Sequence, residues 1–209
     1  MRGMLLSFEG LDGCGKTTQL RRVESWLREQ GRPVLSFREP GGSIISEAVR
    51  QLLLDPTHTA MAGETELLLY TAARVQLLKE KVLPALAAGT TVLLDRFADS
   101  TTAYQGHGRE LPLGIVRTLN ELVRSLAWPD RTWWLDLDPA LSLARTGGED
   151  RMERAGLAFF QRVAAGYRAI HEEEPSRVLR VDASGTPDAI FHHIELDLLR
   201  LFAGRKDPE

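Results

Sequence analysis

A phosphate-binding loop is the feature of this chain whose residue types and spacing could most directly do chemistry. The segment from Gly10 to Thr17, GLDGCGKT, fits the pattern G-x-x-x-x-G-K-[ST] and follows the apolar run Met4–Phe8. In this pattern backbone N–H groups converge on one anion, and the next helix adds its positive N-terminal end. Lys16 can reach the β- and γ-phosphates of a nucleotide, and the Thr17 hydroxyl can hold a magnesium ion. We therefore expect ATP to bind along Gly10, Leu11, Asp12, Gly13, Cys14, Gly15, Lys16 and Thr17.

An acidic and a basic residue follow the apolar run 92–94. Asp95, at the end of this predicted strand, can hold magnesium directly or through water; alternatively it caps the next segment or pairs with Arg96. Two like unit charges about 4 Å apart repel by roughly 4 kcal/mol at an effective dielectric constant of 20. A kinase whose acceptor is itself a phosphate therefore needs a cation between the two phosphates. Arg96 favours such an acceptor, and a structural salt bridge to Asp95 is the alternative.

Two residues inside the loop are unusual at their positions. The Asp12 carboxylate would be repelled by a triphosphate, so it either turns away to accept a hydrogen bond, for instance from an acceptor sugar, or bonds its own backbone. Spacing alone leaves both possibilities open. For Cys14, the only cysteine, the helix start and Lys16 predict a lowered pKa. A role as a small filler is still favoured over a redox switch, since no resolving cysteine exists.

Two further segments could contact a substrate. Tyr70 and Arg74 are four residues apart and share one helix face, where a ring and a guanidinium could stack on and hydrogen-bond a base. Periodicity alone favours the simpler interpretation of a half-buried tyrosine beside a surface arginine. The segment Thr146–Arg151 lies between two predicted helices, and its two glycines could hinge a lid, at about residues 145–154, that closes over ATP. The alternative is a flexible loop with solvated charges.

Strands and helices alternate along the chain in an order that brings these residues to one edge of a sheet. The patterns predict strands at 4–9, 33–38, 91–95, 131–137 and 177–182, and helices at 16–30, 44–54, 64–88, 112–126, 139–145, 152–173 and 186–202. We expect Gly31 to end the first helix, Ser43 to cap the second and Pro84 to bend the third. The segment 96–111 is predicted to be irregular and partly helical. The alternation is typical of an α/β fold with a five-stranded parallel sheet and helices on both faces, which binds ligands at the carboxyl ends of its strands.

Composition and charge limit the partners of the chain. Its 209 residues predict one domain over 1–209, with a frayed tail at 204–209. The formal net charge of −3 implies no broad basic surface, so nucleic acid is not an expected partner. No long uncharged apolar run is present, so no membrane partner is expected. The single cysteine, and a first strand that begins without the apolar segment of a signal peptide, favour the cytoplasm.

Several blocks of residues occur in a fixed order along nearly the whole chain. They are Phe8-Glu9-Gly10-Leu11-Asp12-Gly13 with Gly15-Lys16-Thr17-Thr18-Gln19; Arg38-Glu39-Pro40-Gly41-Gly42; Glu66-Leu67-Leu68-Leu69-Tyr70 with Arg74 and Gln76; Asp95-Arg96-Phe97 with Asp99-Ser100-Thr101 and Ala103-Tyr104-Gln105-Gly106; and Asp150-Arg151 with Glu153 and Asp182-Ala183. The phosphate loop alone would match many families. The ordered set resembles the thymidylate kinase family.

This resemblance implies a P-loop kinase fold with a short lid, transfer of the ATP γ-phosphoryl group to dTMP for dTTP synthesis, a magnesium ion and a homodimer. It implies that Tyr70 stacks on thymine, Arg74 meets the base edge and Arg96 holds the acceptor phosphate. The residues expected around dTMP are Asp12, Glu39, Tyr70, Arg74, Arg96, Ser100, Thr101, Tyr104 and Gln105. The residues expected to be catalytic are Lys16, Arg96, Asp12 and Arg151. In addition to the phosphate loop, Thr18 and Arg145 are expected to contact ATP. The residues expected to hold the metal ion are Thr17 and Asp95.

The chain departs from the family pattern in two places. Tyr70 stands where the family commonly has phenylalanine, which keeps the ring. The lid sequence 146–150 is short and poor in cations, so the arginine that stabilises the transferring group is not assigned among Arg145, Arg151 and Arg154. Two alternatives stay open: a kinase of the same fold for another small acceptor, and a nucleotide-operated switch that binds a protein partner. The Tyr70/Arg74 face and the Asp95-Arg96 pair speak against the switch.

Overall fold

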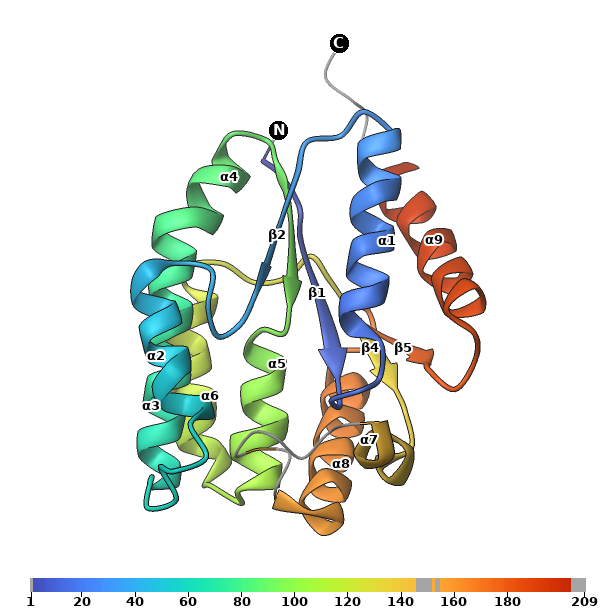
Figure 1. Ribbon diagram of the computed structural model, residues 1–209. Helices are drawn as coiled ribbons and strands as arrows, with labels where there is room; N and C mark the ends of the chain where they lie inside the picture. The colour runs from blue at the N-terminus through green and yellow to red at the C-terminus, as the bar shows by residue number, and fades with distance from the viewer. Residues whose placement is uncertain (1, 146–151, 153–154, 204–209) are drawn as a thin grey trace.

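The structure is a computed structural model that describes residues 2–145, 152 and 155–203. The chain is organised around one parallel sheet. Its strands lie in the order β2-β3-β1-β4-β5 (Figure 1). Their bounds are β1 (Leu5–Gly10), β2 (Val34–Arg38), β3 (Thr91–Asp95), β4 (Arg131–Asp136) and β5 (Val178–Asp182). β1 pairs with β3 on one side and β4 on the other, so the loop after β1 opens where the strand order reverses. That position is where open parallel sheets bind their ligands.

Alternate residues of β1 feed apolar cores on opposite faces of the sheet. Leu6 and Phe8 pack with α1 (Lys16–Glu29) and α9 (Pro187–Ala203), which lie together on one face in Figure 1. Leu5 packs on the other face with α4 (Leu83–Ala87) and with Val123 of α6 (Leu113–Arg124). A third cluster joins β4 to α8 (Leu157–Glu173). The predicted α/β architecture, with helices on both faces, is confirmed.

The helix boundaries near the phosphate loop follow local chemistry. α1 begins at Lys16, directly after the loop, and Gly31 beyond its end has a φ of 69°, a conformation that glycine adopts without strain. α2 (Ile44–Leu54) begins after Ser43, whose side chain accepts a hydrogen bond from the Ser46 backbone N–H at 3.2 Å. Both predicted helix ends are therefore confirmed.

The long helix predicted over 64–88 is not one regular helix. α3 (Gly63–Leu77) passes into a π-helical segment, Leu78–Val82, before α4 begins. The irregularity thus starts upstream of Pro84, the residue expected to bend the helix. A proline ring clashes with the carbonyl four residues earlier, here Glu80, and a wider π turn at that point makes room for it.

Other predicted segments agree with the structure, differ from it or lie outside the described residues. The segment predicted to be irregular is largely helical, with α5 (Ala98–Thr101) followed by a π-helical segment, Thr102–Gly108. α7 (Pro139–Arg145) begins and ends as predicted, whereas α8 begins at Leu157 because Gly156, with a φ of 83°, breaks the helical path. The predicted lid lies outside the described residues apart from Arg145 and Met152, and so does the predicted tail at 204–209. Within the described residues, no helix has the length and apolar character needed to cross a membrane.

Candidate active site

The phosphate loop joins β1 to α1 and lines a cleft of about 650 Å³ at the carboxyl ends of the strands. Gly13 and Gly15 have φ values of 73° and 95°, so they supply the left-handed backbone that the curled loop requires. The Lys16 side chain is buried, and its ammonium donates to the carbonyls of Leu11 at 2.7 Å and Gly10 at 3.3 Å. The lysine is therefore held across its own loop, beside the predicted phosphate position.

The two predicted metal ligands lie in direct contact. Thr17 at the start of α1 donates through Oγ1 to Asp95 Oδ2 at 2.7 Å, although 78 residues separate them in the sequence. Both line the cleft, and a hydroxyl and a carboxylate are the oxygen ligands that Mg²⁺ prefers. No cluster of three or more His, Cys, Asp or Glu suited to a metal occurs in the described part of the chain. The pair therefore fits an ion whose remaining ligands come from nucleotide phosphates and water.

Arg96 does not form the salt bridge to Asp95 that was the alternative to its catalytic role. Its backbone has a φ of 75°, and its side chain reaches the phosphate loop instead. Nη2 donates to Asp12 Oδ1 at 2.5 Å and to the Tyr104 hydroxyl at 3.1 Å, and Nη1 donates to the Gly10 carbonyl at 3.0 Å. Asp12, rather than the neighbouring Asp95, is thus the carboxylate paired with this cation.

The Asp12 carboxylate faces away from the anion-binding amides of its loop. Oδ1 accepts from Arg96, and Oδ2 accepts from the Tyr104 hydroxyl at 3.0 Å. Burial alone would raise the pKa of Asp12, but Arg96 and Lys16 outweigh burial and lower it to about 2. The carboxylate therefore stays ionised at neutral pH and bridges the phosphate loop to the neighbouring cavity.

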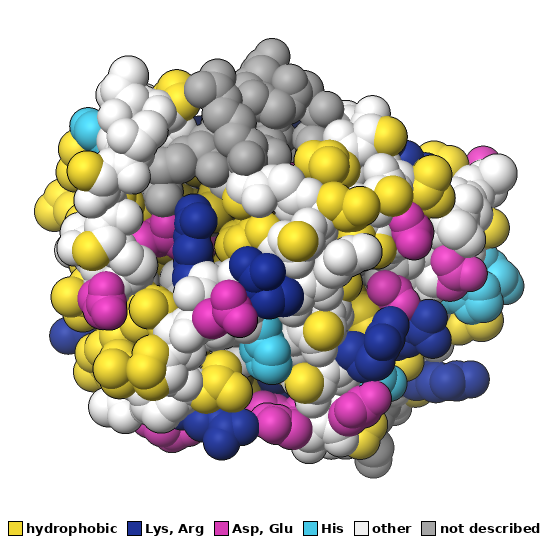
Figure 2. Space-filling model, turned by 90° about the horizontal axis from the view of Figure 1, so that it is seen from below, with side chains coloured by type: hydrophobic (Ala, Val, Ile, Leu, Met, Phe, Trp, Pro, Cys, Tyr) yellow, Lys and Arg dark blue, Asp and Glu magenta, His cyan; other side chains and the backbone are white. Residues whose placement is uncertain are grey.

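That neighbouring cavity brings together all nine residues expected around dTMP. They come from the phosphate loop, the end of β2, α3, the β3–α5 turn, α5 and the π-helical segment after it. The cleft and this cavity share four residues, which are Asp12, Glu39, Arg50 and Arg96. Figure 2 looks onto the end of the molecule toward which the strands point, where basic and acidic side chains of the described residues are interspersed.

Arg74 is a buried residue, so the interpretation of a surface arginine is wrong. Nε donates to Glu39 Oε2 at 2.5 Å, Nη1 to Thr101 Oγ1 at 2.8 Å and Nη2 to the Phe97 carbonyl at 3.0 Å. Arg74 and Glu39 each expose only 2% of their side chains. The four-residue spacing correctly places Tyr70 and Arg74 on one face of α3, but that face turns inward to the cavity.

The prediction that Cys14 has a lowered pKa is also wrong. Its thiol is buried in the core between the sheet and α1. Burial raises the pKa of Cys14, and this effect exceeds the opposing influence of Lys16 and Arg96. The favoured role of a small filler is consistent with this position.

The remaining expected residues are placed unevenly. Thr18 lines the cleft, whereas the Leu11 side chain is buried in the cluster with α8. Arg145, at the end of α7, donates to the Gly13 carbonyl at 3.3 Å. Arg151, the expected catalytic arginine of the lid, lies outside the described residues.

Two residues, one lining the site and one behind it, were missed by reasoning from the sequence. Arg50 on α2 lines both the cleft and the cavity and donates to the Pro40 carbonyl at 2.8 Å. Glu9 is fully buried at the end of β1, where burial and then Asp99 raise its pKa to about 7. A glutamate closing an otherwise apolar strand was a detectable signal, whereas an arginine on an amphipathic helix was not.

Comparison with known proteins identifies relatives over nearly the whole chain. The family model described as thymidylate kinase matches residues 8–194. A protein named thymidylate kinase from Chlorobaculum parvum is 45% identical over 91% of this chain and 93% of its own length. One with the same name from Jannaschia sp. is 47% identical over 93% of this chain and 95% of its own.

A solved structure resembles the fold as well. The crystal structure of thymidylate kinase from Ehrlichia chaffeensis superimposes with a TM-score of 0.80 at 29% identity, covering 95% of this chain and 100% of that one. The ordered blocks, the parallel sheet and the paired cavities at its edge agree with these matches. The chain belongs to the thymidylate kinase family.

Proposed function

We propose that the chain is an ATP-dependent dTMP kinase, which moves the γ-phosphoryl group of ATP to dTMP and yields ADP and dTDP for dTTP synthesis. The observation that carries this proposal is the pair of adjoining cavities that share Asp12 and Arg96. One cavity is built around an anion-binding loop and the other is lined by aromatic, amide and charged side chains. A kinase with a nucleotide acceptor needs both, and their junction is where the phosphates would meet.

On the donor side, the residues of this chain bind and orient ATP. The loop amides and the positive end of α1 hold the phosphates, with Lys16 on the β- and γ-phosphates and Thr18 beside them. Thr17 and Asp95 would hold Mg²⁺, which supplies charge neutralisation between the β- and γ-phosphates when bound. The backbone of this phosphate loop comes from Gly10, Leu11, Gly13, Cys14 and Gly15.

On the acceptor side, Arg96 and Arg50 are the cations that line both cavities and would hold the dTMP phosphate. Tyr70 would stack on thymine, and Arg74 and Gln105 would meet the edge of the base. Tyr104, fixed by Asp12 and Arg96, would stand against the sugar with Ser100 and Thr101. Glu39 has one buried oxygen, Oε1, with no partner among the described residues, which suits a donor on the ligand.

The protein would act by positioning and charge stabilisation, because phosphoryl transfer needs little covalent help. Arg96 screens the two phosphates from each other at the junction. Arg145, already at the Gly13 carbonyl, and Arg151 are the arginines we assign to the transferring group. An arginine in that role is worth about 10³–10⁵ in rate in related reactions.

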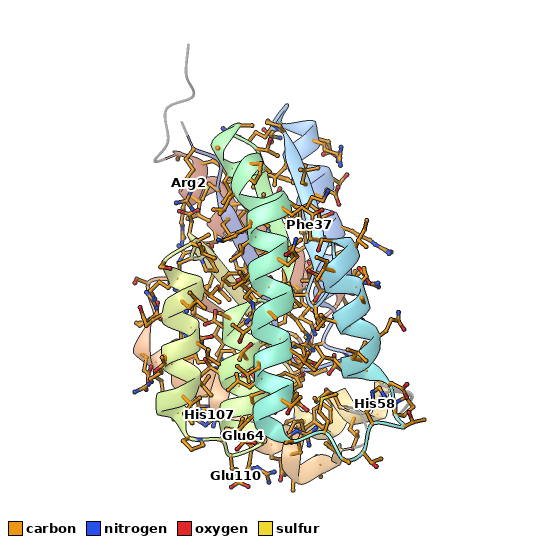
Figure 3. The ribbon with its side chains drawn as sticks, turned by 90° about the vertical axis from the view of Figure 1, so that its left-hand side faces the viewer. Arg2, Phe37, His58, Glu64, His107 and Glu110 are labelled. Atoms are coloured by element: carbon orange, nitrogen blue, oxygen red, sulfur yellow. The ribbon has the colours of Figure 1, made fainter. Side chains whose placement is uncertain are left out.

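We propose a homodimer that works in the cytoplasm as a single-domain enzyme, with a lid near residues 145–154. Figure 3 looks onto α3, with α2 and α6 on either side. These helices carry exposed apolar side chains, which are Ile44, Ile45, Leu52, Leu68, Ile115 and Leu122. Exposed apolar side chains gathered on adjacent helices suit an interface with a second copy. Light scattering on the purified protein measures its mass and tests this state.

The decisive experiment measures ADP release with a panel of nucleoside monophosphates, with and without Mg²⁺. We expect dTMP to give the highest kcat/KM and chelation of Mg²⁺ to stop the reaction. Stimulation by a different monophosphate alone would identify a kinase for another acceptor. ATP turnover that no monophosphate changes would identify a nucleotide switch.

A further inference from the structure

Glu9 is a buried carboxylate at the end of β1 that lines neither cavity and has no part in the proposed reaction. Its four hydrogen bonds within the described part of the chain all go to residues around Arg96. Oε1 accepts from the backbone N–H groups of Phe97 at 2.7 Å and Ser100 at 3.2 Å. Oε2 accepts from the Ser100 hydroxyl at 2.6 Å and the Tyr167 hydroxyl at 2.8 Å. One carboxylate thus ties the start of α5 to α8.

The same two hydroxyls contact the guanidinium of Arg96. Arg96 Nη1 donates to Ser100 Oγ at 3.1 Å and to the Tyr167 hydroxyl at 3.3 Å. Each hydroxyl has a single proton. If both protons point to Glu9, only lone pairs remain to face Arg96, which is what a guanidinium donor requires. The two hydroxyl oxygens also lie 2.8 Å apart. The Glu9 carboxylate therefore determines the orientation of the Ser100 and Tyr167 protons.

We propose that Glu9 is a positioning residue for Arg96: it draws the protons of Ser100 and Tyr167 toward itself and so keeps their oxygens as acceptors for the guanidinium. This inference rests on the proposed function, in which Arg96 holds the acceptor phosphate. Glu9 also fixes the Phe97 and Ser100 amides, so the backbone that follows Arg96 is held by the same side chain.

The surroundings of Glu9 act on its ionisation in both directions. Burial and then Asp99 raise the pKa of Glu9, and the hydrogen bond from Ser100, the charge of Arg96 and the hydrogen bond from Tyr167 oppose them. Asp99 is itself held in a bidentate pair by Arg177, at 2.7 and 2.9 Å. Arg96 is the cation whose charge opposes the raised pKa of Glu9, so the ionised form of Glu9 and the seated form of Arg96 favour each other.

The variant Glu9→Gln tests the inference, because glutamine keeps the shape and the acceptor for the two amides. The NH₂ group of this glutamine donates hydrogen bonds at the position where Oε2 of Glu9 accepts them. The Ser100 and Tyr167 protons must then turn away from residue 9 and toward the Arg96 guanidinium. Hydrogen bonds to a charged group are strong enough that we expect KM for dTMP to rise about tenfold or more. KM for ATP should change less than about twofold, because Lys16 and the loop amides are untouched.

The control is Asp197→Asn on α9, which is also a buried carboxylate changed to an amide. Asp197 accepts from the Trp133 indole at 2.9 Å and lies 2.9 Å from Arg131, on the face of the sheet opposite α5. We expect this variant to lower the thermal midpoint and leave the ratio of the two KM values unchanged. A Glu9→Gln variant that behaves in the same way would overturn the inference.

A double-mutant cycle with Arg96→Ala tests whether Glu9 acts through Arg96. We expect Glu9→Gln to weaken equilibrium dTMP binding in the wild-type background and to add nothing in the Arg96→Ala background. Equal losses in both backgrounds would show a merely structural carboxylate and overturn the inference. If Glu9→Gln does not fold, Tyr167→Phe is tested in its place. We expect KM for dTMP alone to rise about three- to fivefold, which corresponds to the loss of one weak hydrogen bond. No rise in this KM would overturn the inference.

The outcomes separate this inference from the proposed function. A wild-type protein that does not phosphorylate dTMP would overturn both. A wild-type protein that does so, with an active Glu9→Gln variant of unchanged KM ratio, would overturn the inference alone.

Discussion

The buried pair of Arg74 and Glu39 offers a quantitative test of how the acceptor cavity is built. Both side chains are 2% exposed, and Arg74 uses Nε, Nη1 and Nη2 on Glu39, Thr101 and the Phe97 carbonyl. The variant Arg74→Leu fills similar apolar volume but leaves a buried carboxylate without its cation. Breaking such a pair from one side costs about 3–5 kcal/mol of unfolding free energy, because the remaining charge is uncompensated.

Removing both charges should cost less than removing one. In the double variant Arg74→Leu/Glu39→Leu neither charge of the pair remains, and the loss comes mainly from Thr101 and the Phe97 carbonyl, which lose their donors. At about 1 kcal/mol each, this predicts a cost of roughly 2 kcal/mol, clearly below that of the single variant. Glu39→Leu thus acts as a partial rescue of Arg74→Leu.

The pH dependence of the single variant follows from Glu39. Burial raises the pKa of Glu39, and Arg74 opposes this through its charge and its hydrogen bond. Without Arg74 the folded pKa lies further above the unfolded one, so between these values the folded state binds more protons. Stability then falls as pH rises through that window. Arg74→Leu should therefore lose less stability at pH 5 than at pH 8, relative to wild type.

Urea unfolding followed by tryptophan fluorescence, at both pH values, measures these differences. The double variant lacks the Glu39 carboxylate and serves as the control, with a cost that does not vary between the two pH values. A single variant that costs under about 1 kcal/mol, or one no worse than the double variant, would refute the placement of a charged pair inside the cavity wall.

Three further predictions concern the phosphate loop. Lys16→Met should lower kcat by about a hundredfold or more while the protein still folds, since it removes a cation from the transferring phosphates; steady-state assays and circular dichroism check this. The buried Cys14 thiol, whose pKa burial raises, should react slowly with a thiol reagent at pH 8 and rapidly in urea. Gly10→Ala should cost about 1–3 kcal/mol in urea unfolding, because a Cβ there would lie 2.4 Å from the Leu135 carbonyl oxygen and Gly10 has a φ of +135°.

The fold was largely predictable because its signals are local. Apolar runs, the Ser43 cap and the glycine after α1 each act through neighbours a few residues away, and the structure has the expected five strands and their order along the chain. The π-helical segments at Leu78–Val82 and Thr102–Gly108 were not predictable in this way. A π turn is selected by what packs on either side of the helix, and periodicity does not contain that information.

For the site, the sequence predicted which residues gather but not how they pair. The blocks brought Asp12, Arg74 and Arg96 into one cavity, as expected. The partner of Arg96 was left open between an acceptor and Asp95, because adjacency in the sequence gives no information about a left-handed residue that turns the side chain away. The pKa of Cys14 was misjudged for a related reason: a helix start lowers a thiol pKa only if burial does not outweigh it.

Arg74 and Arg96 were hard to interpret from the sequence for one physical reason, which is that both arginines are already paired within the fold. Around α5, Arg74 pairs with Glu39, Arg96 with Asp12 and Arg177 with Asp99. Side chains held in this way lose little rotamer freedom when a ligand arrives, and their charges are already aimed, which is the condition for electrostatic stabilisation at low reorganisation cost. A carboxylate beside each cation also keeps the empty cavity from holding unbalanced charge. The pairing that makes these arginines look structural is therefore what prepares Arg96 to receive a phosphate.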